Sequence, residues 1–351
     1  MEPTVIFRVD GGNVYSVAMG HVYRCVRLAR VLRGEGIYCL FFMRQYPEGV
    51  SLVEAADFDI EIIRDGLSVE EEGSLIISRA LTKQAIIFVD LRTPNKVIID
   101  LANTHHIPTI VYEDVSLEAL EPTLLINPSL GCENLYGSDK TRYLLGNDYI
   151  ILEPEIAEYR RHFFSATIKK LFVCFGGADP CNLASRVMAI LLKMAHDFAI
   201  DMTIGPAFGH AAQLEGIINN HAGNKSVNLI SGCNKLAPIM SKADAAITAG
   251  GTIVYEAVAM RLPTLALPSI AHEARIISIL MDKGIVMGLR KDTAEADEGE
   301  LNTVISRFFT DIEERKHCYQ IQETCDITHG ITAVVNNILS LFSAQSCHLN
   351  H

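Results

Sequence analysis

Short and almost uninterrupted apolar runs alternate with longer amphipathic segments along the first half of the chain. The runs are predicted to be strands, and they lie at 5–10, 37–43, 59–63, 85–90, 108–114 and 123–127. Helices are predicted between them near 21–34, 68–81 and 94–106. Strands that are apolar at nearly every position are buried on both faces, so the pattern predicts a parallel sheet with helices on each side.

The alternation stops near the middle of the chain and then starts again. Residues 128–168 are rich in turn-forming and charged residues, whereas 169–180 is an apolar run that leads directly into a glycine turn. A helix is predicted at 181–195, and a helical pattern returns at 301–342. The apolar runs predicted to be strands between these two helices lie at 198–205, 226–230, 244–251, 263–268 and 284–289.

This repetition predicts an α/β protein with two doubly wound, Rossmann-like domains, at 1–160 and 168–342, and a linker at 155–168. A chain of 351 residues is long for one compact core, which agrees with two domains. Ligands of open parallel sheets bind beyond the carboxyl ends of the strands. We therefore expect the two domains to face a central cleft that holds the ligand.

The balance of charge narrows the choice of partners. The net charge of −12 opposes binding to nucleic acid or to an anionic membrane, although backbone amides can still bind a nucleotide.

The nine cysteines are scattered without a CxxC pair, as in proteins of a reducing compartment. The segment MEPTVIFRVD does not resemble a signal peptide, and no apolar run approaches the length of a membrane span. We expect a cytoplasmic protein without membrane insertion, either a monomer or a weak dimer.

Residues 10–21, DGGNVYSVAMGH, join the first predicted strand to the first helix. Glycine permits tight turns, and the free amides of a helix N-terminus attract negative charge. His21 is expected in the first turn of the helix, where the helix dipole favours a neutral imidazole that can act as a base. The alternative is that His21 only caps or packs this helix.

A second glycine turn, CFGGADPCN at 174–182, follows the first predicted strand of the second domain. Gly176 and Gly177 would let the backbone approach a ligand. Asp179 is expected to cap the next helix, with a catalytic role as the alternative. The segment is neither a P-loop nor a dinucleotide-binding fingerprint.

The third glycine turn lies in ITAGGTIVYEAVAMRLPTLALP, residues 247–268. A nucleotide diphosphate would rest on the helix N-terminus formed by Gly250, Gly251 and Thr252. Glu256 would accept hydrogen bonds from the ribose hydroxyls; the alternative is a solvated residue of the helix.

Four further polar residues are expected at the carboxyl edges of the sheets. His272 and Glu273 begin the helix that follows the strand at 263–268. Asp90 and Asp114 close two strands of the first domain, where each either contacts the substrate or caps a loop. No HExxH motif and no other spacing of His, Cys and Asp predicts a metal site.

Together these segments resemble the UDP-sugar hydrolases of pseudaminic acid biosynthesis and the related spore-coat polysaccharide proteins. The resemblance covers about residues 4–290 and includes FRVDGGNVYSVAMGHVYRCVRLARVL, FGGADPCN and AGGTIVYEAVAMRLPTLAL. The last segment is also similar to one in the glycosyltransferase that makes lipid II. The matched positions of the first two motifs are Arg8, Asp10, Gly20, His21, Arg24, Cys25, Gly176, Gly177, Asp179 and Asn182.

The resemblance implies the two-domain GT-B fold and an enzyme without a metal or other cofactor. The family removes UDP from a 2,4-diacetamido-2,4,6-trideoxy hexose by attack of water at the anomeric carbon. The resemblance implies that His21 is the catalytic imidazole. Many members have Asn-Gln where this chain has His272-Glu273, so this second imidazole is expected either to position water or to bind a different sugar.

We accordingly assign the expected site residues to three groups. The catalytic group is His21 and His272. The residues expected beside the substrate are Arg8, Asp10, Gly20, Arg24, Asp90, Asp114 and Glu273. Those expected beside the nucleotide are Gly176, Gly177, Gly250, Gly251, Thr252 and Glu256.

Three functions agree with these residues. The first is hydrolysis of a UDP-linked amino or deoxy sugar, with UDP as product, in nonulosonic acid or surface polysaccharide biosynthesis. The second is transfer of the sugar from a UDP-sugar donor to another acceptor by a GT-B glycosyltransferase. The third is a nucleotide-sugar binding protein without catalysis. Turnover without an acceptor distinguishes the first, and transfer product only with an acceptor distinguishes the second.

Overall fold

The computed structural model divides into two compact units, Met1–Glu153 with His329–His351, and Pro154–Thr328. Each unit is a parallel α/β sheet with helices around it. The residues that the structure describes are 2–12, 17, 19–93, 96–112, 120–130, 132, 136–221, 223, 225–233, 235–291, 293 and 295–348.

The first unit has a seven-stranded sheet in the order β3-β2-β1-β4-β5-β6-β7, and every adjacent pair is parallel. Its strands are β1 (Thr4–Val9), β2 (Tyr38–Arg44), β3 (Asp59–Ile63), β4 (Ile86–Asp90), β5 (Thr109–Tyr112), β6 (Leu124–Asn127) and β7 (Arg142–Leu145). Its helices are α1 (Gly20–Gly34), α2 (Pro47–Ala55), α3 (Val69–Lys83), α4 (Lys96–Thr104) and α12 (Gly330–His348), with a 3-10 turn η1 (Asn147–Tyr149).

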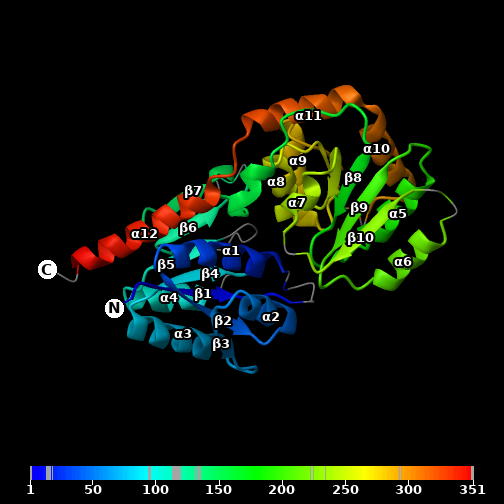
Figure 1. The fold of residues 1–351 in the computed structure, drawn as a ribbon. Helices are drawn as coiled ribbons and strands as arrows, with labels where there is room; N and C mark the ends of the chain where they lie inside the picture. The colour runs from blue at the N-terminus through cyan, green and yellow to red at the C-terminus, as the bar shows by residue number, and fades with distance from the viewer. Residues whose placement is uncertain are drawn as a thin grey trace. The chain divides into compact units, whose positions relative to one another are not determined.

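Successive residues of β1 point to opposite faces of this sheet. Phe7 lies in a core with residues of α1 and α12, and its ring stacks 4.9 Å from that of Phe41. Ile6 lies in a second core with residues of α3 and α4. The two cores explain why the strands are apolar throughout: helices cover both faces of the sheet (Figure 1).

The second unit has a six-stranded parallel sheet in the order β10-β9-β8-β11-β12-β13. Its strands are β8 (Lys170–Cys174), β9 (Ala199–Ile204), β10 (Val227–Ser231), β11 (Ala245–Thr248), β12 (Thr264–Ala266) and β13 (Met287–Gly288). Its helices are α5 (Leu183–Lys193), α6 (Ala211–Asn219), α7 (Ala237–Met240), α8 (Thr252–Ala259), α9 (Ala271–Asp282), α10 (Glu298–Thr310) and α11 (Ile312–Thr324), preceded by a 3-10 segment η2 (Pro154–Tyr159).

Strand order reverses once in each sheet, between β1 and β4 in the first and between β8 and β11 in the second. At such a switch point the connections leave in opposite directions and a crevice opens at the carboxyl ends of the strands. The connection to α1 follows β1, and the two glycine turns of the second unit follow β8 and β11. The chemistry-bearing segments therefore lie at the two switch points.

The predicted strands of both halves are confirmed, but α2, α6, α7 and β7 were not predicted from the sequence. The predicted end of the second domain also differs from the structure. Residues 301–342 were assigned to it, yet α12 packs on the first unit through Ile331, Val334 and Ile338. Gly330 permits this packing, because a side chain there would collide with the backbone of Ile150. The apolar stripe of α12 predicts a buried face without indicating which sheet it covers.

No helix in the described part of the chain is long and apolar enough to cross a membrane. Among the same residues, no group of three or more His, Cys, Asp or Glu side chains is arranged to hold a metal ion.

Candidate functional site

His21 stands in the first turn of α1 and contacts the last residue of β4. Its Nδ1 lies 2.7 Å from Oδ1 of Asp90, whose side chain is fully buried, while the His21 side chain is 12% exposed. An ionised carboxylate only accepts hydrogen bonds, so this contact requires a proton on Nδ1, and in the neutral imidazole the lone pair is then on Nε2. Nη2 of Arg24 also lies 2.9 Å from Nδ1. Met19 is the N-cap residue of α1, and its side chain makes no capping hydrogen bond. The catalytic role of His21 stays a prediction.

Arg24, one turn further along α1, binds the same carboxylate with two nitrogens. Its Nε lies 2.7 Å from Oδ2 of Asp90 and its Nη2 lies 2.6 Å from Oδ1. Burial alone would raise the pKa of Asp90, but the charge of Arg24 and the hydrogen bonds from Arg24 and His21 outweigh it and hold this pKa well below its usual range. The guanidinium also lies over the ring of Tyr112, 4.2 Å from its centroid.

Cys25 completes this cluster, with its Sγ 3.5 Å from Oδ2 of Asp90. Burial, followed by the charge of Asp90, raises the pKa of the Cys25 thiol well above its usual value. The thiol therefore stays protonated and acts as a weak donor. His21, Arg24 and Cys25 thus share one partner, Asp90, for which the sequence predicted only a substrate contact or a loop cap.

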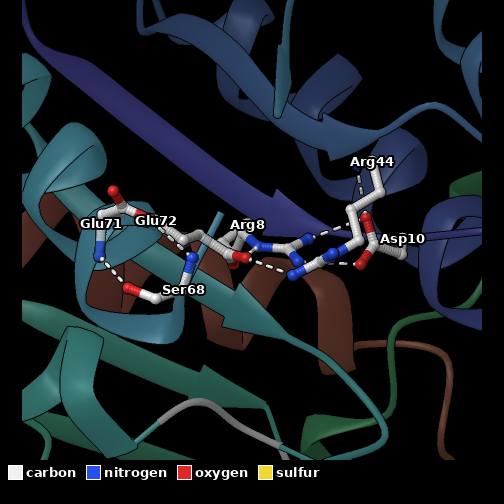
Figure 2. Close-up of polar contacts among 6 residues, drawn as sticks. All are labelled: Arg8, Asp10, Arg44, Ser68, Glu71 and Glu72. Atoms are coloured by element: carbon white, nitrogen blue, oxygen red, sulfur yellow. Dashed lines mark hydrogen bonds and ion pairs between the residues drawn. The ribbon is translucent and has the colours of Figure 1, made fainter. Parts of the chain in front are cut away.

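Arg8 and Asp10 belong to a different network at the same edge of the sheet (Figure 2). Nη2 of Arg8 donates to Oδ2 of Asp10 at 2.8 Å, and Nε donates to Oε1 of Glu72 at 2.6 Å. Arg44 closes the network: its Nη2 donates to Oε2 of Glu72 at 2.7 Å, and its backbone N–H donates to Oδ1 of Asp10 at 2.8 Å. Glu72 and Arg44 were not found by sequence reasoning, because neither lies in a motif.

In the second unit, the glycine turn after β8 is built by close backbone approach. Gly176 has φ +79°, a conformation that favours glycine, and a side chain on Gly205 would collide with the backbone of Gly177. Asp179 accepts hydrogen bonds from the backbone N–H groups of Leu183 at 2.8 Å and Ala184 at 2.7 Å. The predicted capping role of Asp179 is therefore confirmed, and this carboxylate occupies the N-terminus of α5.

The turn after β11 leads into α8. Gly251 is the N-cap residue and has no side chain of its own to cap the helix. A Cβ on Gly250 would lie 2.7 Å from Cβ of Glu273, so only glycine fits there. Thr252 is the first residue of α8, and Glu256 is buried one turn later. The Glu273 carboxylate accepts a hydrogen bond from the backbone N–H of Gly250 and so lies at the turn that begins α8.

Glu273 and His272 lie in the first turn of α9. Oε2 of Glu273 accepts hydrogen bonds from the N–H and the hydroxyl of Ser269, each at 2.7 Å. Burial raises the pKa of Glu273 above its usual value. The carboxylate thus holds the turn between β12 and α9, and its predicted substrate contact stays a prediction, as does the catalytic role of His272. Gly20 begins α1, and Asp114 lies outside the described residues.

Comparison with known sequences places the chain near two proteins, while no protein family model matches it. It is 26% identical over 283 residues to the uncharacterized protein MJ1062 of Methanocaldococcus jannaschii, covering 74% of this chain but 54% of that protein. The chain thus spans about half the length of this relative. It is also 26% identical over 300 residues to the spore coat polysaccharide biosynthesis protein SpsG of Bacillus subtilis, covering 82% of this chain and 84% of SpsG.

Comparison with solved structures finds glycosyltransferases over nearly the whole chain. MurG of Acinetobacter baumannii has a TM-score of 0.68 at 12% identity, covering 96% of this chain and 100% of MurG. HepE of Anabaena, solved in complex with UDP-glucose, has a TM-score of 0.63 at 12% identity, covering 97% and 99%. The spinosyn rhamnosyltransferase SpnG has a TM-score of 0.64 at 14% identity, covering 95% and 98%. At such identities the likeness shows the fold, which is GT-B, and the predicted fold class is confirmed.

Proposed function

We propose that the chain is an enzyme of surface polysaccharide or nonulosonic acid biosynthesis that hydrolyses a UDP-linked amino or deoxy sugar. The observation that carries the proposal is the contact of 2.7 Å between Nδ1 of His21 and Oδ1 of Asp90, which leaves Nε2 of His21 as a base. The similarity to SpsG supports the biosynthetic context, and the UDP-glucose complex of HepE supports a UDP-sugar ligand for this fold.

In the proposed reaction, Nε2 of His21 takes a proton from water as the water oxygen bonds to the anomeric carbon. The bond from that carbon to the diphosphate oxygen breaks, and its electron pair leaves with UDP. Asp90 stabilises the imidazolium that forms, and Arg24 holds Asp90 in place. The products are the free sugar and UDP, and the proton on His21 returns to solvent.

The leaving diphosphate develops negative charge, and we assign the backbone N–H groups at the α8 N-terminus as donors for it. Gly250, Gly251 and Thr252 form this N-terminus, and Gly176 and Gly177 provide a second backbone approach at the neighbouring strand β8. Backbone N–H groups at a helix N-terminus stabilise such charge without a metal ion. We therefore expect turnover to persist in the presence of EDTA.

The decisive experiment incubates the protein with a panel of UDP-sugars and CMP-sugars in ¹⁸O-labelled water, with and without EDTA. Hydrolysis at the anomeric carbon predicts free UDP and one ¹⁸O on the sugar. The His21→Ala variant should lose turnover by about 100-fold or more while it still binds UDP. His105→Ala, which changes an exposed histidine of the same unit, should keep wild-type turnover. Label on the nucleotide, or full activity of His21→Ala, contradicts the proposed reaction.

A second candidate is sugar transfer to an acceptor other than water, and the glycosyltransferase neighbours MurG and SpnG favour it. In that reaction Nε2 of His21 would take the proton of an acceptor hydroxyl instead. Release of UDP would then require the acceptor and would give no ¹⁸O-labelled sugar. The same labelled panel, repeated with sugar and lipid acceptors, separates the two reactions.

A further inference from the structure

Glu72 is the centre of the charged network at the carboxyl ends of β1 and β2 (Figure 2). Both of its oxygens are bound, Oε1 by Nε of Arg8 and Oε2 by Nη2 of Arg44. Glu72 and Arg8 are each only 2% exposed, whereas the Arg44 side chain is about one-third exposed. The two arginines and the two carboxylates of Glu72 and Asp10 sum to zero charge, so the network is neutral as a unit.

The side chain of Arg8 binds the carboxylates of this network, Glu72 and Asp10, and not a ligand. It lies two residues after Ile6 on β1, so both side chains point to the face of the sheet that α3 and α4 cover. α1, which carries His21, covers the other face. Burial alone would lower the pKa of Arg8, but Asp10 and Glu72 raise it above its usual value, so the guanidinium stays charged.

The network ends on the segment that leads to His21. Asp10 takes hydrogen bonds from Arg8 and from the backbone of Arg44, which fixes the end of β1 against the end of β2. The next residue, Gly11, is packed without spare room. A side chain on Gly49 would collide with the Gly11 carbonyl oxygen, and a side chain on Gly11 would collide with Val22. Val22 follows His21 directly on α1.

From these contacts we infer that Glu72 is a positioning residue for the proposed reaction, acting through Arg8 and Asp10 on the first turn of α1 and so on His21. Arg8 and Asp10, expected beside the substrate, then hold the site in place instead. Buried ion pairs add little to stability compared with apolar packing, so a positional role gives a better reason for this network. The inference rests on the proposed function for its activity measurements only.

The test replaces Glu72 with Gln, which keeps the shape and removes the charge. We expect kcat to fall by about 10- to 100-fold, because a shift of the base by about 1 Å costs this much. The dissociation constant of UDP should stay within about twofold, because the nucleotide residues lie in the other unit. The imidazole NMR signals of His21, in protein labelled with ¹⁵N-histidine, should shift relative to wild type.

Glu70→Gln is the matched control, since Glu70 is an exposed acid on the same helix, and it should leave kcat and the His21 signals unchanged. Arg44→Met provides a second variant if Glu72→Gln does not fold, because it removes the exposed end of the network and leaves the pair of Arg8 with Glu72. It should change the same readouts by a smaller amount. Unchanged His21 signals in both folded variants overturn the inference, whatever happens to kcat.

The two proposals fail in different ways. If wild-type protein shows no turnover with any nucleotide sugar, the proposed function is wrong. The His21 signals of Glu72→Gln and Arg44→Met still decide whether the network positions this imidazole. If wild type is active and Glu72→Gln keeps its kcat, the proposed function stands and the positioning role of Glu72 is wrong.

Discussion

His21 and Asp90 are 69 residues apart in the chain, yet Nδ1 of one lies 2.7 Å from Oδ1 of the other. The strand order explains the contact: β1, which precedes α1, pairs with β4, which ends at Asp90. The last residue of β4 and the first turn of α1 therefore meet at the switch point. The imidazole is oriented by a carboxylate that is itself held by two nitrogens of Arg24.

Replacement of Asp90 by Asn should reduce turnover more than nucleotide binding. The amide keeps the shape of the carboxylate but does not stabilise a protonated His21, so we expect turnover to fall by about 100- to 10,000-fold. The affinity for UDP, measured by calorimetry, should stay within about twofold because the α8 N-terminus is unchanged. Asp100→Asn, an exposed change on α4, is the control. Wild-type turnover of Asp90→Asn would show that His21 does not need its partner.

The Asp90 carboxylate should also make the first unit sensitive to acid. Its pKa is held below the usual 3.8, so the unfolded chain binds this proton more readily than the folded one. The stabilisation is thus fully present above about pH 5 and is lost as the pH falls below about 4. Urea unfolding at pH 7, 5, 4 and 3 should show Asp90→Asn less stable than wild type at pH 7, with the difference shrinking toward pH 3. A difference independent of pH contradicts this assignment.

The sequence predicted the fold well because each strand carries its own signal. A run such as 85–90 is apolar at nearly every position, and burial on both faces follows from that pattern alone. The first turn of α1 was also predictable, since Gly20 and His21 come shortly after Gly11 and Gly12 in the sequence. The type and burial of one helix or strand, and the residues of the connection beside it, can be inferred from local sequence.

The partners of these residues could not be predicted in the same way. Asp90 was found as the end of a strand, but its contact with His21 depends on strand order. Glu72 is one of three consecutive glutamates in the first turn of α3, and only the packing of that helix determines which of them is buried. Which of the two sheets α12 covers likewise depends on tertiary structure and not on local sequence.

The cap at Asp179 should contribute to the stability of the second unit. Asp179 binds two backbone N–H groups of α5 and has φ +45°, a conformation that Asn tolerates better than Ala. We expect Asp179→Ala to lower the free energy of unfolding by about 2 kcal/mol and Asp179→Asn by less. Urea unfolding measures both, and the exposed change Asp197→Ala serves as control. Equal losses for Ala and Asn would mean that the backbone conformation at 179 does not matter, and no loss in either variant would mean that the cap does not.

The glycine at 250 should be necessary for nucleotide binding. In Gly250→Ala the new Cβ would lie 2.7 Å from Cβ of Glu273 and 2.9 Å from Cδ1 of Ile277, so the turn before α8 has to move. We expect a loss of about 1–3 kcal/mol of stability and UDP binding weaker by about tenfold, because the N–H groups at the α8 N-terminus are displaced. Gly216→Ala on α6, where nothing lies within 4 Å, should bind UDP normally and be as stable as wild type or more so. Unweakened UDP binding by a folded Gly250→Ala protein would exclude this turn as the diphosphate site.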